Sequence, residues 1–330
     1  MFPAGERVYS YSMLRLRPAK LATLSALLAF FAPPARATML ETPPPPLRLV
    51  LNSFGAVRGN PLGLSVEGRL SLRQRLYAAD ELALRDNFAA IGIQGALTPA
   101  YTRLGLIAQV QPLTVLALYA SADAHAYFGN FDNLRSFASA NAEWGTSAAD
   151  AASKLPSGAP GRPTAATNFQ VTFGAKLQLK VGPFALSNGT ELVRASASLR
   201  DGDRVFFDPP LAALVPQKAF VFTDDLDLLW LDGKGLVAGV RWSLLHPFFG
   251  ERHYLPGELQ QGDANQMRMG PLVAYRFFKS DGRLFNAPTL FVLANWYLQH
   301  RYRTGAEVSQ AIPYLAVGFG FFGDLIGLRP

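Results

Sequence analysis

The stretch Phe169–Val181, FQVTFGAKLQLKV, decides the fold because apolar side chains alternate along it, without an error, with polar or small ones. Such a period of two places the apolar side chains on one face of a β-strand. At roughly 3.3 Å per residue the stretch is about 43 Å long, and a tilt of about 45° makes it cover roughly 30 Å, the hydrocarbon thickness of a bilayer. Strands of globular proteins are usually about half as long. The stretch therefore predicts a strand that crosses a membrane.

Working outward from this stretch, we find the same alternation, less cleanly, along most of the chain. Together with 169–181, these segments predict an all-β fold: a transmembrane, antiparallel, up-and-down β-barrel of about twelve strands. The further candidate strands are 47–58, 64–73, 88–98, 101–111, 113–128, 184–200, 219–231, 236–244, 267–278, 289–299 and 314–322.

The connections between these strands alternate in length, as they do in barrels with short inner turns and long outer loops. The predicted inner turns carry proline, glycine or aspartate, the residues of tight turns, at 111–112, 182–183, 232–235 and 280–283. The predicted outer loops are 129–167, 201–218, 248–266 and 304–308. Two places fit less well, because the inner connection 78–87 is long and the outer turns at 59–63 and 98–100 are short.

The N-terminal region has the composition of a signal peptide rather than of a strand. Basic residues precede a short apolar run at 21–31, and Ala35-Arg36-Ala37 forms a cleavage signal, so we expect residues 1–37 to be removed. Residues 38–46 form a Pro-rich N-terminal spacer, the barrel occupies 47–322, and 323–330 is a C-terminal tail. The chain has no cysteine, which excludes disulfides and fits export through an oxidising periplasm.

In this pattern the chain resembles Gram-negative outer-membrane β-barrel proteins as a class, over about residues 47–322, without the motif of any one family. The resemblance implies an outer-membrane location reached through the periplasm, contact with outer-membrane lipid, and assembly by the barrel-assembly machinery. Many members end on a terminal Phe, whereas here Phe321 and Phe322 are followed by the tail. The net charge of +7 comes partly from the signal peptide, so no nucleic-acid partner is expected.

The polar positions of the predicted strands indicate a mildly cationic lumen. We expect a passive diffusion channel or a surface-structural protein, not primarily an enzyme, and a channel of this charge would favour small anionic solutes. The alternative is that the same charges pair with lumen carboxylates and plug the barrel. The predicted lumen-lining residues are Glu67, Arg69, Arg73, Lys176, Gln178, Lys180, Arg241 and Arg276.

Two other functions stay open at the level of sequence. Asp123 and His125 on one strand, with Asp225 and Asp227 on another, resemble the paired residues of omptin outer-membrane proteases. The resemblance implies a barrel hydrolase in which the Asp/His pair is the general base and the Asp pair positions water. The order of the pairs is reversed relative to omptins, and Asp224 falls on the predicted lipid face. The other alternative is a soluble exported β-sandwich.

No cofactor or metal is predicted. The four histidines are scattered, at His125, His246, His253 and His300, and make no metal site by their spacing. The chain also lacks a phosphate-binding loop, a dinucleotide fingerprint and the nucleophile motif of the α/β-hydrolases.

Overall fold

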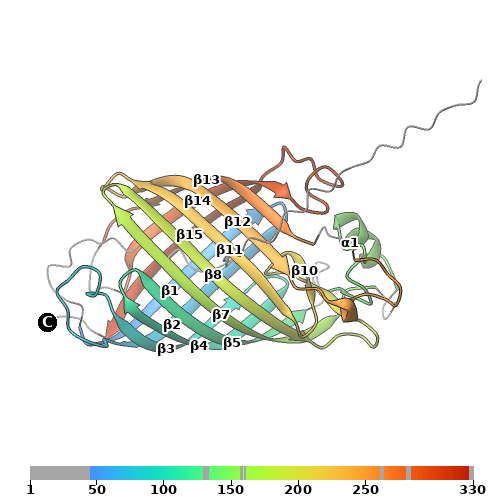
Figure 1. Cartoon of the computed structure of the whole chain (residues 1–330), viewed down its shortest axis with the longest axis horizontal. Coiled ribbons are helices and arrows are strands. Elements are labelled where there is room, and N and C mark those ends of the chain that lie inside the picture. Colours follow the sequence, from blue (N-terminus) through green and yellow to red (C-terminus); the bar gives the residue numbers. More distant parts are fainter. Residues whose placement is uncertain are drawn as a thin grey trace, which may run out of the picture.

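A computed structural model describes residues 45–128, 134–156, 159, 161–260, 264–279 and 284–326. The predicted signal peptide and most of the Pro-rich spacer lie outside the described residues. Twelve strands form one closed antiparallel barrel (Figure 1), in the order β1-β15-β14-β13-β12-β11-β8-β7-β5-β4-β3-β2. The predicted all-β barrel of about twelve strands is therefore confirmed. The β-sandwich alternative is wrong, because these strands close into a single sheet.

Each barrel strand coincides with a segment that alternates in the sequence. The barrel strands are β1 (Leu47–Gly59), β2 (Gly63–Gln74), β3 (Phe88–Leu97), β4 (Tyr101–Leu113), β5 (Leu116–Phe128), β7 (Ala165–Val181), β8 (Phe184–Ala197), β11 (Phe220–Leu231), β12 (Leu236–Pro247), β13 (Gln266–Arg276), β14 (Asn286–Gln299) and β15 (Tyr314–Ile326). The largest differences are at two ends. β7 begins at Ala165 rather than 169, and β15 continues to Ile326, past the barrel end expected at 322.

The alternation within a strand separates the outside of the barrel from its lumen. On β7, Phe169 and Phe173 point outward with 53% and 52% of their surface exposed, whereas Gln170 and Thr172 between them point inward and are buried. Directly opposed residues of an antiparallel pair share a face. The registers of β5 and β8 with β7 therefore show which of their residues point inward and which point outward. The same reasoning continues from strand to strand around the barrel.

The connections divide the barrel into two ends, which we call the turn end and the loop end. Short turns such as 114–115, 182–183 and 232–235 lie at the turn end, which is also where β15 ends. The connections β5–β7, β8–β11, β12–β13 and β14–β15 lie at the loop end (Figure 1). The predicted sides agree with the structure throughout the described residues. The turn expected at 111–112 lies at 114–115 instead, because β4 continues to Leu113, and the turn expected at 280–283 lies outside the described residues.

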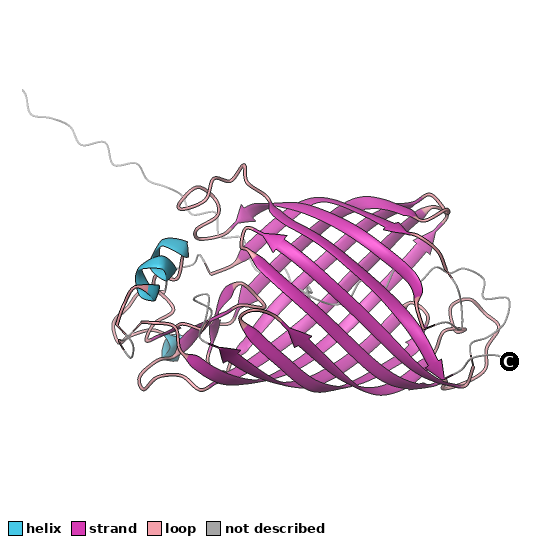
Figure 2. Cartoon of the chain, turned by 180° about the vertical axis from the view of Figure 1, so that it is seen from behind, coloured by secondary structure: helices cyan, strands magenta, loops and turns pink. Residues whose placement is uncertain are grey.

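The four long connections fold together into a cap over the loop end (Figure 2). The cap contains a three-stranded sheet of β10 (Ala213–Pro216), β9 (Val205–Asp208) and β6 (Ser136–Phe137), in that order. It also contains α1 (Thr146–Ser153) and a 3-10 turn at Glu251–His253. Among the described residues, no helix is both long enough and apolar enough to cross a membrane.

Candidate functional site: the closed mouth of the barrel

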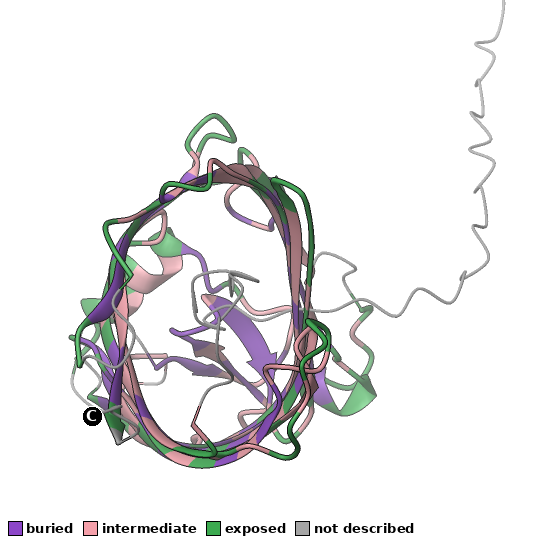
Figure 3. Ribbon diagram, turned by 90° about the vertical axis from the view of Figure 1, so that its left-hand side faces the viewer, coloured by how far each residue is buried: buried purple, intermediate pink, exposed green. Residues whose placement is uncertain are grey.

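The most informative site is the mouth at the loop end, where part of the β8–β11 connection folds inward. We call Val205–Pro216 the plug segment; it comprises β9, β10 and the tight connection between them. Viewed along the barrel from the turn end, its buried strands lie across the interior (Figure 3). Val205, Phe206 and Val215 have no exposed surface. The sequence predicted a surface loop here, and the structure corrects this to a buried hairpin.

Three barrel strands hold the tip of the plug segment by hydrogen bonds. Arg58 on β1 donates to the carbonyl of Pro209 at 2.8 Å. Tyr127 on β5 donates from its hydroxyl to the carboxylate of Asp208 at 2.7 Å, and both side chains are buried. Gln266 on β13 donates to the carbonyl of Ala212 at 3.2 Å. Because these strands are well separated in the barrel order, the tip spans the mouth rather than resting on one wall.

An apolar cluster seals the plug segment against the inner wall. Plug residues Phe206 and Val215 pack with Tyr101, Val193 and Val221, which point inward from barrel strands. Burying a large apolar side chain contributes roughly 1.5–3 kcal/mol relative to leaving it exposed. The plug segment is thus a packed part of the structure, held by both apolar contacts and hydrogen bonds.

Asp208 is the buried ionisable group of the plug segment. It has no exposed surface, and its second carboxylate oxygen has no hydrogen-bond partner. Burial raises the pKa of Asp208 from 3.8 to about 6, because desolvation disfavours the charged form more than Tyr127, Arg103 and Arg58 stabilise it.

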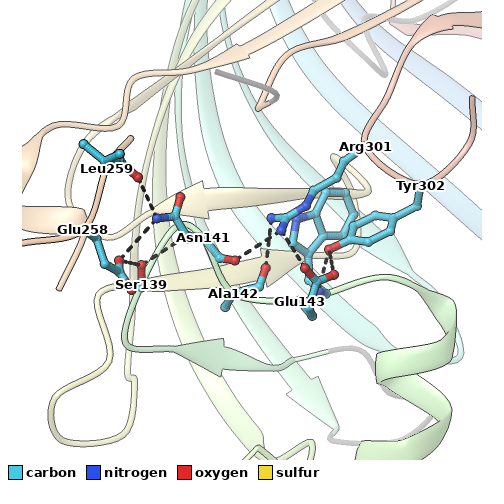
Figure 4. Close-up of polar contacts among 9 residues, drawn as sticks. Ser139, Asn141, Ala142, Glu143, Glu258, Leu259, Arg301 and Tyr302 are labelled. Carbon is cyan, nitrogen blue, oxygen red and sulfur yellow. Dashed lines mark hydrogen bonds and ion pairs between the residues drawn. The ribbon is translucent and has the colours of Figure 1, made fainter. Parts of the chain in front are cut away.

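Above the plug segment, a second set of contacts joins the outer parts of three connections (Figure 4). Arg301, in the β14–β15 connection, donates to Glu143 at 2.7 Å and to the carbonyls of Asn141 and Ala142. Tyr302 also donates to Glu143, at 2.8 Å. Ser139 contacts Glu258 of the β12–β13 connection. These contacts therefore fasten three of the four connections of the cap to one another.

The lumen below the mouth is crossed by a polar network on the β2–β5 side. Arg103 forms an ion pair with Glu67 at 2.9 Å. Arg69 donates to Gln94 at 2.9 Å, and Gln94 donates to Asp123 at 2.8 Å. These bonds satisfy buried polar groups that would otherwise be costly to keep from water.

On the opposite wall, Arg241 of β12 organises the carboxylates of β11. It holds Asp227 in a two-pronged pair, with donor–acceptor distances of 2.6 and 2.7 Å, and contacts Asp225 at 3.3 Å. Ser243 also donates to Asp225. The register, which places Asp227 opposite Arg241 and Asp225 opposite Ser243, explains why these groups meet.

All the residues predicted to line the lumen occupy inward positions. Glu67, Arg69 and Arg73 alternate with the exposed Val66 and Leu72 on β2. Lys176, Gln178 and Lys180 share the inward face of β7, and Lys180 near the turn end is exposed. Arg241 and Arg276 point inward from β12 and β13, where Arg276 lies opposite the buried Thr289. That they line an open channel stays a prediction.

The four residues of the hydrolase alternative also point inward, but they form no joint site. Asp123 accepts hydrogen bonds from Gln94 and Ser121, while Asp225 and Asp227 are engaged by Arg241. The ring of His125 is buried between Tyr101 and Tyr127, with centroids 6.0 Å from each, and neither ring nitrogen has a hydrogen-bond partner. Within the described part of the chain, no hydrogen bond or ion pair joins the β5 pair to the β11 pair. A hydrolase stays a prediction.

Asp224 occupies the outward face of β11, as the sequence indicated. It is nevertheless buried, and Asn188 of β8 donates to its carboxylate at 2.7 Å. The strand is therefore in the predicted register, and a partner on the neighbouring strand accommodates the carboxylate. No group of three or more histidine or acidic residues able to hold a metal occurs in the described part of the chain.

Sequence comparisons find no matching family model and no matching curated protein. Among solved structures, the chain is similar to the translocator domain of the autotransporter NalP from Neisseria meningitidis, with a TM-score of 0.40, 9% identity, and coverage of 84% of this chain and 88% of that one. CdiB from Acinetobacter baumannii gives a TM-score of 0.36 and 9% identity over 85% of this chain and 60% of that chain.

A KdgM porin, solved in complex with disordered oligogalacturonate, gives a TM-score of 0.36 and 8% identity over 83% of this chain and 98% of that one. These solved structures include a porin and an autotransporter domain, the kind of protein that the sequence resembles. Similarity at this level says nothing about what the chain does. Its function has to be argued from the geometry of its own mouth and lumen.

Proposed function

We propose that this protein is an outer-membrane channel whose outer mouth is closed by its own plug segment. Its outward face supports a lipid environment, because apolar residues such as Phe169, Ile91, Leu104 and Leu228 expose more than half of their surface there. A closed barrel satisfies its backbone hydrogen bonds without free edges, as the hydrocarbon region requires. Barrels of this kind carry their long loops on the outside of the cell, so the loop end faces outward.

The observation that carries the proposal is a set of hydrogen bonds to the tip of the plug segment. They come from Arg58, Tyr127 and Gln266. Bonds from three separated strands to residues 208–212 close the mouth in the resting state. Toward the turn end, inward residues such as Lys176, Gln178 and Lys180 are partly or fully exposed. The lumen is thus more accessible from the turn end, and passage through the barrel requires the plug segment to move.

The pairing of lumen charges favours small anionic solutes. Four inward carboxylates are each engaged by an arginine: Glu67, Asp225, Asp227 and Asp324. Arg73 and Arg268 instead lie over the rings of Phe88 and Tyr314, at 4.6 and 4.2 Å, and neither forms a direct ion pair with a carboxylate among the described residues. Such unpaired cations raise the local concentration of anions.

Planar-bilayer conductance tests the proposal. The wild-type barrel should conduct rarely, and a variant with 205–216 replaced by a Gly-Ser linker should conduct steadily. Replacing α1, residues 146–153, with a linker of equal length is the matched control and should behave as wild type. The reason is that α1 belongs to the cap but, among the described residues, makes no hydrogen bond to the plug tip. Equal conductance in all three proteins contradicts plugging, and no conductance in any of them indicates a surface-structural role.

The proposed solute class has its own test in the open variant. In a KCl gradient its reversal potential should show an anion preference. Lys176→Glu combined with Lys180→Glu should shift that potential toward cations, because both side chains lie on the inward face of β7. An unchanged reversal potential contradicts the proposed cationic lumen. It does not bear on the proposal that the plug segment closes the mouth.

A further inference from the structure

Arg194 is a cation on the outward, apolar face of the barrel. It lies opposite Val171 of β7 and opposite Phe220 of β11, both on the outward face. Its side chain is exposed, and it forms no ion pair among the described residues. A charged group cannot rest in hydrocarbon at low cost, so an outward arginine directs its guanidinium to the polar boundary of the membrane.

Two more cations lie beside Arg194 through backbone contacts. The amide of Lys218 donates to the carbonyl of Ala195, the neighbour of Arg194, at 2.9 Å. The guanidinium of Arg252 donates to the carbonyl of Lys218 at 3.3 Å. Lys218 adopts a left-handed backbone with φ of 57°, a conformation that costs energy in a non-glycine residue and that both contacts hold in place. We call Arg194, Lys218 and Arg252 the basic patch.

The basic patch carries uncompensated charge. All three side chains are exposed, and none of them forms an ion pair within the described part of the chain. Glu251 is exposed next to Arg252 in the described structure but forms no ion pair with it. Asp224 lies farther along β11, and its carboxylate accepts a hydrogen bond from Asn188. The positive charge of the basic patch therefore favours the binding of an anion.

Its position identifies the kind of anion. The patch sits at the loop end of β8 and β11, where the outward face of β11 begins with the exposed Phe220. A ligand that binds here meets cations on one side and a lipid-facing wall on the other. A free phosphate uses only the first of these features, whereas an anionic lipid uses both.

We propose that the basic patch binds the phosphate groups of an anionic lipid in the leaflet surrounding the loop end. Two arginines and a lysine suit this role, because guanidinium groups donate paired hydrogen bonds to phosphate oxygens and an ammonium group adds a point charge. The site rests on the proposed outer-membrane location with the loop end outward. It is independent of whether the barrel conducts.

Binding of lipid A, which carries two phosphates, to the full-length barrel in neutral detergent tests the site. The affinity should fall at least tenfold in Arg194→Gln/Lys218→Gln/Arg252→Gln. The charge-matched control Lys154→Gln/Lys234→Gln/Lys279→Gln changes three exposed cations away from the patch and should bind as wild type. Lipid A from which both phosphates have been removed should bind the wild type no more tightly than it binds the patch variant.

Three outcomes overturn the proposal: equal lipid A binding by the patch variant and the wild type, equal binding of the phosphate-free lipid, or full competition by millimolar inorganic phosphate. Heat-dependent gel mobility verifies that each barrel is folded. If the triple variant does not fold, Arg252→Gln alone, in the 3-10 turn outside the barrel wall, should still weaken binding several-fold, and no change there counts against the patch. Lipid A binding in detergent does not depend on conductance. A failure of the channel proposal is therefore seen in the bilayer recordings and not in this binding assay.

Discussion

At the scale of single residues, Asp208 links the closed mouth to pH. In the plugged state its pKa is about 6, against an ordinary value of 3.8, so protonation favours the buried state. This contribution is fully present below about pH 3.8 and is lost as the pH rises through about 6. We therefore predict that bilayer conductance increases from pH 4 to pH 7. Asp208→Asn, which stays neutral, should remain closed across this range.

The groups that act on Asp208 are the hydroxyl of Tyr127, the backbone amide of Leu211 and the guanidinium groups of Arg103 and Arg58. Conductance that is independent of pH in the wild type, or equally steep in Asp208→Asn, would show that another group controls the mouth. The measurement is a series of single-channel recordings at fixed salt, since ionic strength also changes the interactions of Asp208 with the two arginines.

Arg241 is predicted to be the most costly lumen cation to remove. Arg241→Met leaves the buried carboxylates of Asp225 and Asp227 without their cation, and removing one partner of a buried pair costs about 3–5 kcal/mol. Unfolding monitored by heat-dependent gel mobility should therefore shift to a clearly lower temperature. Lys180→Met, at an exposed inward position, is the control and should leave the transition unchanged. Equal stability of both variants would contradict the role of Arg241.

Inward or outward orientation could be predicted from the sequence residue by residue, because it depends only on a period of two. Partners could not. Arg241 and Asp227 are fourteen positions apart, and their pairing depends on the register of β11 with β12. The aromatic residues show the same limit. Tyr101 and Tyr127 lie near strand ends, where membrane barrels carry outward-facing aromatic residues, yet both point inward and pack against the plug segment.

At the scale of elements, β7 offers a direct test of the two faces. Phe173 lies near the middle of this strand and points outward. Phe173→Arg should therefore lower the unfolding free energy by about 2–4 kcal/mol in a bilayer, as expected for a lipid-facing cation near the midplane. Gln178→Arg introduces the same side chain on the inward face and should be tolerated. Urea unfolding in vesicles measures both, and similar losses would contradict the assigned faces.

The plug segment is the element that sequence reasoning missed. Because it lies within a long connection, residues 201–218 were predicted to be a surface loop. The signal that could have corrected this is composition: Val205, Phe206 and the run Leu211–Val215 are strongly apolar, whereas an exposed loop is polar. Their burial depends on side chains from the opposite wall, which no local pattern reveals.

At the scale of the whole molecule, strand number and the sides of the connections could be predicted together. Each strand reverses direction, so the length of each connection tests the strand count independently of the strands themselves. The closure of β1 onto β15 was implied only by the need to leave no free edge. The folding of four connections into one cap could not be predicted, because it depends on contacts such as those of Arg301 with residues 141–143.

Maleimide labelling of single cysteines in intact cells tests the central claim most directly, since the chain has no cysteine of its own. With a membrane-impermeant reagent added outside, Lys176→Cys should stay unlabelled in the plugged protein and become labelled when 205–216 is replaced by a linker. Leu177→Cys, its outward neighbour, should stay unlabelled in both. Labelling of Lys176→Cys in the plugged protein, or labelling of Leu177→Cys as fast as Lys176→Cys, would contradict a membrane-spanning barrel with a closed mouth.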